Sequence, residues 1–311
     1  MTADAVVPLG VAVVNLDTRE VLADCLTSVL AARAPEVVVV DNGSTDGSIE
    51  LVRTRFAGVG LIANDRNVGY GAAANQAIAA CAAPAVLLLN SDTVLEPDAL
   101  TALGAYLATQ PRAAIVGPRL ANRDGTLQRS TYPFPSAADT LLGESGLHLL
   151  LRRIPLLRER SWRTWSHEEA RPVPWVLGAA LAIRREPFEA VGGFDGAFFM
   201  YGEEVDLCRR LHDAGHATHF APVTTVVHLG GVSTGTRPAA MRREFLVSKR
   251  RYMLKHEGRR PAARLLAVMR AAVLARLVRD RLRRRLGAGP ELDRAIAAWQ
   301  DLLADRGLWR A

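Results

Sequence analysis

A cluster of carboxylates, Glu203-Glu204-Val205-Asp206, stands directly after an aromatic-rich run of the sequence. Such a cluster is often only a solvated helix start, stabilised by the helix dipole. Here Leu207 and Leu211 follow Glu204 at helical spacing, so the three share one face of the helix predicted from Glu203 to Gly215. Desolvation of an inward-facing carboxylate raises its pKa towards that of a useful general base. The pattern therefore predicts an acid–base role for Glu204.

Asp92 and His228 are a second pair of candidates, because each follows a predicted strand. A carboxylate and an imidazole at strand ends, together with a substrate diphosphate, would hold Mg²⁺ or Mn²⁺. Two plainer interpretations stay open. Asp92 could cap the helix predicted after Pro97, and a lone histidine at a strand end is more often a hydrogen-bonded structural residue.

The elements that must position these side chains are read from apolar runs, which predict strands at Val11–Val14, Val37–Val40, Gly60–Ala63 and Ala85–Leu89. Helical patterns separate them. Apolar strands without alternation are buried on both faces, which is typical of an α/β fold with a parallel sheet between helices. Ligands of such sheets bind at the carboxyl ends of the strands, where Asn15, Asp41 and Asp92 stand.

The segment Gly69–Ala74 matches the pattern GxGxxA, and Asp92 lies at a suitable distance downstream for a dinucleotide-binding acid. This keeps an NAD-dependent dehydrogenase as an alternative. The context is poor, because the fingerprint should directly follow the first strand of its βαβ unit, whereas Asp65-Arg66-Asn67-Val68 intervenes here.

Composition and charge exclude several classes. The 311 residues are 49% hydrophobic and 23% charged, which excludes a disordered chain and a disulfide mini-scaffold. Residues 1–237 hold 20 Lys+Arg against 25 Asp+Glu, whereas residues 238–311 hold 19 against 7, so the net charges are −5 and +12. An acidic body with a basic tail argues against a nucleic-acid binder.

Cysteine usage and targeting patterns indicate a compartment. Cys25, Cys81 and Cys208 form no CxxC pair, which favours a reducing compartment and argues against structural zinc. Neither a signal peptide nor a membrane-spanning run is recognisable. We expect a cytoplasmic protein, with peripheral contact at the inner face of the cell membrane as an option.

That option rests on residues 261–286, predicted to form a basic amphipathic helix. Arg270, Arg276 and Arg281 flank an apolar stripe of the helix, which consists of Leu266, Met269, Val273 and Leu277. The net charge of the tail favours an anionic membrane surface. The alternative is that the stripe packs on the catalytic domain or on a second subunit, which leaves an oligomer possible.

Seven segments, in this order, carry a resemblance to a known family: Val11–Asn15, VVVVDNGSTDGS (37–48), NVGYGAAAN (67–75), LLLNSD (87–92), WVLGAALAIRR (175–185), VGGFDGAFFMYGEEVDLCRRL (191–211) and HLGGVSTG (228–235). The sequence resembles family 2 glycosyltransferases of the GT-A fold, especially their bacterial rhamnosyltransferase-like branch. The resemblance covers about Pro8 to Gly258. It implies a GT-A-like, mixed and mostly parallel sheet flanked by helices.

The resemblance also implies roles at the nucleotide and metal ends of a site. Asp41 would read the base of the nucleotide, enclosed by Asn15, Arg66 and Asn67. Asp92 matches the last Asp of the family's DxD motif, and His228 matches the histidine that completes the metal site for Mg²⁺ or Mn²⁺. Asn90 replaces the first Asp of that motif, which weakens the expected ribose and metal contacts there.

At the reacting end, Glu204 falls at the general base of the family's ED pair, written here as Glu203-Glu204. Because this base is Glu rather than Asp, Glu203 stays open as the proton acceptor. Gly178 would leave room beside the sugar, with Trp175 as an apolar wall. No QxxRW motif follows the base, which argues against a processive synthase.

The predicted organisation is a glycosyltransferase domain at 1–240, with an irregular helical insertion at 133–174, and a basic helical extension at 241–311. The implied reaction is an inverting, non-processive transfer from a nucleoside diphosphate sugar, with dTDP-rhamnose as the donor that the branch indicates. The acceptor would be a carbohydrate or lipid-linked hydroxyl of cell-envelope polysaccharide or glycolipid synthesis. A sugar-phosphate nucleotidyltransferase and a non-catalytic binding module stay open beside the dehydrogenase.

Overall fold

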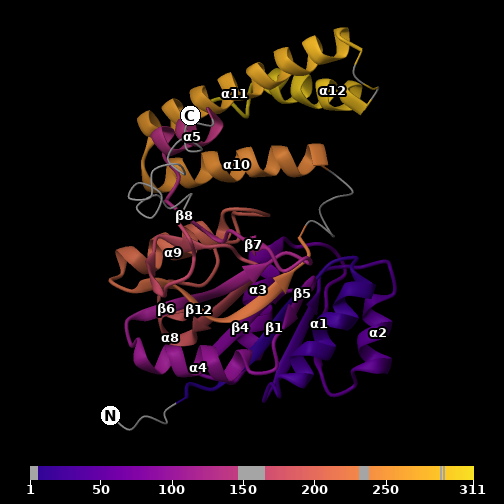
Figure 1. The fold of residues 1–311 in the computed structure, drawn as a ribbon, viewed down its shortest axis with the longest axis vertical. Coiled ribbons are helices and arrows are strands. Elements are labelled where there is room, and N and C mark those ends of the chain that lie inside the picture. The colour runs from indigo at the N-terminus through magenta and orange to yellow at the C-terminus, as the bar shows by residue number, and fades with distance from the viewer. Residues whose placement is uncertain (1–5, 146–164, 231–237, 288, 290) are drawn as a thin grey trace. The chain divides into compact units, whose positions relative to one another are not determined.

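The structure is a computed structural model, and it describes residues 6–145, 165–230, 238–287, 289 and 291–311. The chain divides into two compact units, one of residues 1–134 and 165–236, the other of residues 135–164 and 237–311 (Figure 1). Residues 135–145 therefore group with the C-terminal helices, and residues 165–174 belong to the first unit. The sequence pattern instead treats 133–174 as one insertion of the first domain. Residues 146–164 of that expected insertion lie outside the described part.

The first unit is built on a sheet with the strand order β3-β2-β1-β4-β11-β6-β12-β5. These strands are β1 (Leu9–Asn15), β2 (Val37–Asp41), β3 (Gly60–Ala63), β4 (Ala85–Asn90), β5 (Thr93–Leu95), β6 (Ala113–Ala121), β11 (Ala180–Arg184) and β12 (Ala217–His228). Strand β1 pairs in parallel with β2 and β4, and β6 with β12, while β11 runs antiparallel between β4 and β6. The expected mixed α/β sheet is confirmed.

Short strands and six helices complete the described part of this unit. Strands β7 (Leu127–Gln128) and β9 (Arg171–Val173) extend the sheet, and β8 (Thr131–Tyr132) pairs with β10 (Trp175–Val176). The helices are α1 (Arg19–Ala31), α2 (Ser48–Arg55), α3 (Tyr70–Ala80), α4 (Ala99–Thr109), α8 (Arg185–Ala190) and α9 (Glu203–Asp213). Helix α4 begins well after Asp92 and has Asp98 at its N-cap, so the capping interpretation of Asp92 is wrong.

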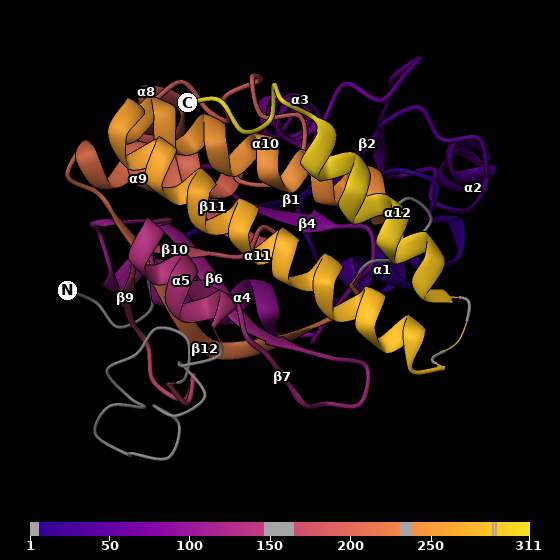
Figure 2. The same ribbon diagram turned by 90° about the horizontal axis from the view of Figure 1, so that it is seen from above.

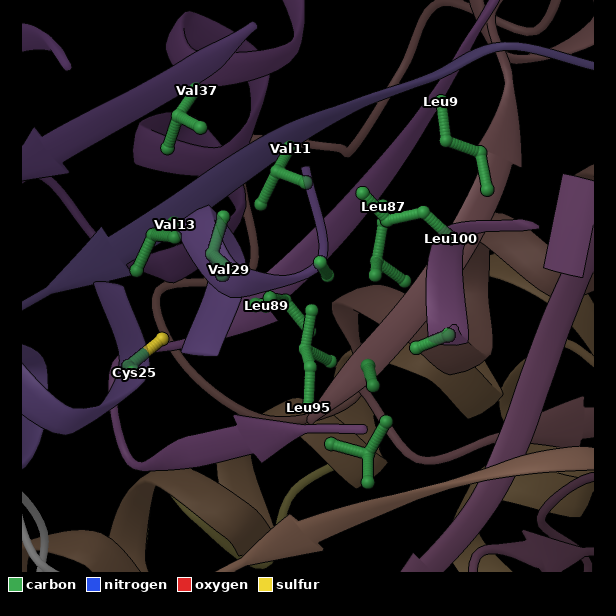
Figure 3. Close-up of a cluster of buried hydrophobic side chains, with 14 of the residues drawn as sticks. Leu9, Val11, Val13, Cys25, Val29, Val37, Leu87, Leu89, Leu95 and Leu100 are labelled. Carbon is green, nitrogen blue, oxygen red and sulfur yellow. The ribbon is translucent and has the colours of Figure 1, made fainter. Parts of the chain in front are cut away.

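The core lies where the apolar strands meet the helices that cover them. Every residue of β1 and of β2 is buried, as their unalternating sequences predict. Figure 3 shows Val29 of α1 among Val11 and Val13 of β1 and Leu87 and Leu89 of β4. Full burial of one such side chain stabilises the fold by about 1.5–3 kcal/mol, so this core fixes the strand ends that carry the site.

The second unit is helical, with α5 (Ala137–Glu144), α10 (Pro238–His256), α11 (Arg259–Arg285) and α12 (Glu291–Ala304). Helix α11 packs against the other three, and Figure 2 shows α12 running beside it. Two polar contacts reinforce this packing. The indole of Trp299 donates to the buried carboxylate of Asp280 (3.0 Å), and Arg276 pairs with Glu144.

The apolar stripe that the sequence analysis predicts to contact a membrane is buried in this unit. Leu266, Met269, Val273 and Leu277 are each at most 5% exposed. The expectation that these four residues contact lipid is wrong, because they already pack against neighbouring helices. Among the described helices, none contains a stretch long and apolar enough to cross a membrane.

Candidate active site

The carboxyl ends of three central strands form one edge of the sheet. The parallel register places Asn15 of β1 opposite Asp41 of β2, and Val14 opposite Asn90 of β4. The amide of Asn15 donates to Asp41 Oδ2 (2.7 Å), and the backbone N–H of Ser44 donates to Asp41 Oδ1 (2.8 Å). The predicted grouping of polar residues at this edge is confirmed.

A cavity of about 290 Å³ opens at this edge. Most of the site residues that the sequence nominates line it, namely Asn67, Asn90, Asp92, Gly178, Glu203, Glu204 and His228. Four others are not among its lining residues: Asn15 and Asp41 lie buried with their side chains engaged, and Arg66 is exposed. The fourth is Trp175, whose indole donates to the carbonyl of Pro133 (2.9 Å). Asn42 contributes instead, and its amide donates to Asn67 Oδ1 (2.9 Å).

Two glycines bring the walls of this site together. Gly43 has φ +87°, and a Cβ there would lie 2.8 Å from the Cα of Arg66. Gly69 has φ +93°, and a Cβ there would lie 2.8 Å from the carbonyl oxygen of Phe199. Gly69 therefore permits close packing of α3 on the segment before α9. The GxGxxA match is explained by this packing, at a helix that follows β3 rather than β1.

Asp92 and His228 meet although 136 positions separate them, because β12 pairs antiparallel with β5 and places His228 opposite Thr93. His228 Nε2 lies 3.3 Å from Asp92 Oδ1 and 3.5 Å from the amide nitrogen of Asn90. The buried Oδ1 of Asn90 has no hydrogen-bond partner among the described residues. A strand-end carboxylate, an imidazole and the side-chain amide of Asn90 thus meet.

Gln128 of β7 orients His228, and no sequence pattern indicated it. Its Oε1 accepts from His228 Nδ1 (2.7 Å), while its Nε2 donates to the carbonyl of His228 (3.4 Å). In the neutral imidazole this leaves a lone pair on Nε2 facing Asp92, an arrangement that suits a cation between them. The donor set fits Mg²⁺ or Mn²⁺, and imidazole is the better match for Mn²⁺. The role of Gln128 could have been predicted only from the β6–β7 hairpin, which places Gln128 opposite Leu120.

The described residues include no group of three or more His, Cys, Asp and Glu side chains that could hold a metal ion. Asp92 and His228 could therefore anchor a cation only with help from Asn90 and from a ligand. A diphosphate would supply the remaining oxygens, which couples metal binding to substrate binding.

The carboxylates at the start of α9 are buried, as expected for Glu204. Glu203 and Glu204 are 6% and 7% exposed, and both line the cavity. Glu204 Oε2 accepts from the backbone N–H of Gly202 (3.1 Å), while Glu203 Oε2 has no partner among the described residues. The third carboxylate, Asp206, instead forms an ion pair with Arg210 (2.8 Å).

Burial shifts the pKa of both glutamates in the same direction. Burial raises the pKa of Glu204 above its usual value. Burial and the neighbouring charge of Glu204 raise the pKa of Glu203 well above its usual value. The backbone N–H of Gly202 stabilises the carboxylate form of Glu204 and so opposes the effect of burial there.

Tyr70, at the start of α3, joins the two walls near these carboxylates. Its hydroxyl donates to the carbonyl of Gly178 (3.0 Å). Burial and the charges of Glu203 and Glu204 raise its pKa well above the usual value, so it remains a donor. A Cβ on Gly178 would lie 3.8 Å from the side chain of Glu204, so Gly178 stands directly beside the second glutamate.

Two buried hydroxyl groups link the carboxyl end of β1 to the turn after β4. Thr18 Oγ1 donates to Asn15 Oδ1 (2.6 Å) and so accepts from Ser91 Oγ (2.7 Å). The end of β1 is thereby tied to the turn that carries Asp92. Neither hydroxyl stood out in the sequence.

The mixed α/β sheet with its flanking helices is the GT-A fold of glycosyltransferases, as solved structures show. A mannosyltransferase from Pyrobaculum calidifontis with GDP-Man and Mn²⁺ aligns with TM-score 0.56 and 16% identity, over 98% of this chain and 83% of that one. GalNAc-T7 with UDP, GalNAc and Mn²⁺ aligns with TM-score 0.53 and 17% identity, over 72% of this chain and 44% of that one.

Residues 7–247 match the family described as "Glycosyltransferase like family 2". The chain is 34% identical over 229 residues to the N-acetylglucosaminyl-diphospho-decaprenol L-rhamnosyltransferase of Mycobacterium tuberculosis, covering 68% of this chain and 72% of that protein. The protein therefore belongs to glycosyltransferase family 2, in its bacterial rhamnosyltransferase-like branch, and uses a nucleotide sugar. The nucleotidyltransferase, dehydrogenase and binding-module alternatives are set aside.

Proposed function

We propose that the protein transfers L-rhamnose from dTDP-rhamnose to a hydroxyl of a lipid-linked sugar, in the synthesis of cell-envelope glycan. The observation that carries this proposal is the 34% identity to the mycobacterial rhamnosyltransferase, whose acceptor is a polyprenyl diphosphate sugar by its name. That alignment takes in most of the glycosyltransferase domain rather than a single motif.

Glu204 is the general base of this proposal. The carboxylate of Glu204 accepts the backbone N–H of Gly202, which stabilises its charged form, so Glu204 is the proton acceptor of this proposal. Glu204 takes the proton of the acceptor hydroxyl while that oxygen attacks the anomeric carbon, and the bond from this carbon to the diphosphate breaks. Direct displacement inverts the anomeric centre. The absence of a QxxRW motif after the base supports a non-processive transfer. Gly178, which carries no side chain, leaves room for the sugar beside Glu204.

Asp92 and His228 would hold Mg²⁺ or Mn²⁺, with the amide oxygen of Asn90 as a further contact. When bound, the cation offsets the negative charge that develops on the departing diphosphate. The chain's own part is to keep the ligands in position: Gln128 fixes the His228 ring, and the Thr18–Ser91 bond fixes the turn of Asp92.

The nucleotide lies, in this proposal, along the edge next to the metal. Asn42 and Asn67 line the cavity there. Asp41 reads the base, with Asn15 and Arg66 enclosing it. Since the carboxylate of Asp41 already accepts from Asn15 and Ser44, base recognition by this group needs those two contacts to rearrange or be shared.

A donor comparison tests the function. The purified chain is incubated with dTDP-rhamnose, UDP-N-acetylglucosamine or GDP-mannose, with Mn²⁺, and with a short-chain polyprenyl diphosphate N-acetylglucosamine as acceptor. We expect a rhamnosylated product by mass spectrometry, with inverted anomeric configuration by NMR. Transfer from UDP-N-acetylglucosamine or GDP-mannose but not from dTDP-rhamnose would overturn the proposed donor. Transfer only to a soluble sugar would overturn the proposal of a lipid-linked acceptor.

A further inference from the structure

Helix α11 carries a second apolar row, distinct from the buried one. Leu274, Val278 and Leu282, named here the exposed stripe, recur every four residues and are 52%, 49% and 53% exposed. At 100° per residue they lie on one side of the helix, roughly 135° from the centre of the buried stripe. Exposed Ala267, Ala271 and Ala275 widen this side.

Arginines surround the exposed stripe. Helix α11 contains ten arginines and one acidic residue, Asp280, which is buried. On the helical projection Arg270 and Arg281 border the stripe, while Arg264 and Arg285 stand at its two ends. All four are exposed, and none of them pairs with an acidic side chain in the part of the chain that the structure describes.

Other cations of this unit are engaged within it. Arg243 pairs with Asp305, Arg284 with Asp293, and the guanidinium of Arg242 lies 4.3 Å from the ring centroid of Trp299. Unlike these three, the four arginines around the exposed stripe remain available to an anionic ligand, as does Arg283 on another side of α11.

From this arrangement we infer that the Leu274–Leu282 side of α11 binds the surface of an anionic lipid bilayer. An apolar row with cations at its borders matches acyl chains beneath anionic headgroups. A nucleic acid would use the arginines but not the leucines. A second copy of the chain would bring the same arginine-rich side towards this one, and like charges would repel.

The inference goes beyond the proposed reaction and concerns a different unit of the chain. It also differs from what the sequence pattern favoured, because the residues that reach the lipid are those left outside by the packing of α11. The arginines that flank the apolar residues contribute about fivefold in affinity each at low salt.

Vesicle sedimentation with the full chain tests the inference. Wild type is mixed with vesicles of phosphatidylcholine and phosphatidylglycerol, and with vesicles of phosphatidylcholine alone. We expect co-sedimentation with the anionic vesicles and at least about tenfold weaker binding to the neutral ones. High salt weakens the binding because it screens the arginines.

Two variants separate the two contributions. The triple variant Leu274→Gln, Val278→Gln, Leu282→Gln should lose about tenfold or more of the affinity for anionic vesicles. The variant Arg270→Gln, Arg281→Gln should lose about 25-fold at low salt and little at high salt. The matched control, Leu30→Gln with Val223→Gln, changes exposed apolar residues of the first unit and should bind as wild type does.

Circular dichroism and hydrolysis of the donor sugar, neither of which needs a membrane, should be unchanged in every variant. Vesicle binding by the triple variant equal to wild type would overturn the inference. So would an absence of binding by wild type, or a dimer in light scattering that only the triple variant loses. An absence of donor hydrolysis by the wild-type protein would count against the proposed function and not against the membrane inference.

Discussion

Helices α9 and α11 both carry dense charge on an amphipathic pattern, yet they use it in opposite ways. At the start of α9, Glu203 and Glu204 are buried side by side, and burial raises the pKa of both. Along α11, the arginines around the exposed stripe remain in solvent. A buried charge acts as an individual chemical group, whereas exposed charges act together through a field that salt screens.

The comparison predicts that single buried charges of the first unit control the chemistry. The largest effect should come from Asp92→Ala, because this removes the carboxylate that would anchor the cation beside His228. We expect sugar transfer to fall by at least about 10³-fold, together with its dependence on Mn²⁺. Steady-state rates with and without Mn²⁺ measure this, and Asp98→Ala, at an exposed carboxylate outside the cavity, is the control. Full transfer by wild type in EDTA would contradict the metal role of Asp92.

Glu204, the proposed general base, should give the second-largest effect on the transfer rate. Glu204→Gln should lower the transfer rate by about 10² to 10⁴ while the affinity for the donor stays the same, since an amide cannot accept the proton. Single-turnover rates and donor titration separate the two quantities. Arg270→Gln removes one exposed charge from α11 and should leave the rate on a water-soluble acceptor within about twofold. If Glu203→Gln is the slower enzyme, the proton acceptor is Glu203.

A smaller effect is expected at Gln128, which touches His228 and not the cation. Gln128→Leu removes the acceptor for His228 Nδ1, so the ring loses its fixed orientation, and the affinity for Mn²⁺ should fall about 10- to 100-fold. Electron paramagnetic resonance titration of Mn²⁺ in the presence of a nucleoside diphosphate measures the affinity directly. Gln128→Glu keeps an acceptor and should retain most of the binding; equal losses in both variants would argue against a positioning role.

The smallest expected effect concerns stability and its dependence on pH. Because the pKa of Glu203 is raised in the folded protein, the folded state binds more protons than the unfolded state above the usual glutamate pKa. Stability is therefore lost as pH rises through that window. Glu203→Gln, which cannot ionise, should raise Tm at neutral pH relative to wild type, and the difference should shrink as pH falls towards 4. Calorimetry across this range checks the sign; an unchanged difference at low pH would contradict it.

Much of the site was accessible from local sequence. Unalternating apolar runs indicated the strands, and the spacing from Glu204 to Leu211 indicated that Glu204 faces inward. Both signals are local, because they depend on which faces of one element must leave water. The sequence pattern made no prediction for the burial of Glu203, which follows from the turn before α9: this turn, with Tyr201 and Gly202 both at positive φ, faces the cavity rather than solvent.

Residues from distant parts of the chain came together only through strand order. His228 reaches Asp92 because β12 pairs with both β6 and β5, and Gln128 reaches His228 because β7 folds back on β6. Neither pairing leaves a periodic trace in the sequence. Residue types alone could nominate His228, but they could not supply the partner that orients its ring.

The amino-acid sequence by itself determined the α/β class, the acidic body and basic tail, and the polar strand ends, because composition and periodicity are properties of short segments. The tertiary structure decided which apolar side of α11 is buried. Periodicity shows that a helix has an apolar side, but α11 has two, and only the packing of α5, α10 and α12 around Val273 and Leu277 selects one for the interior. The other, with Leu274 and Val278, is left for solvent or lipid.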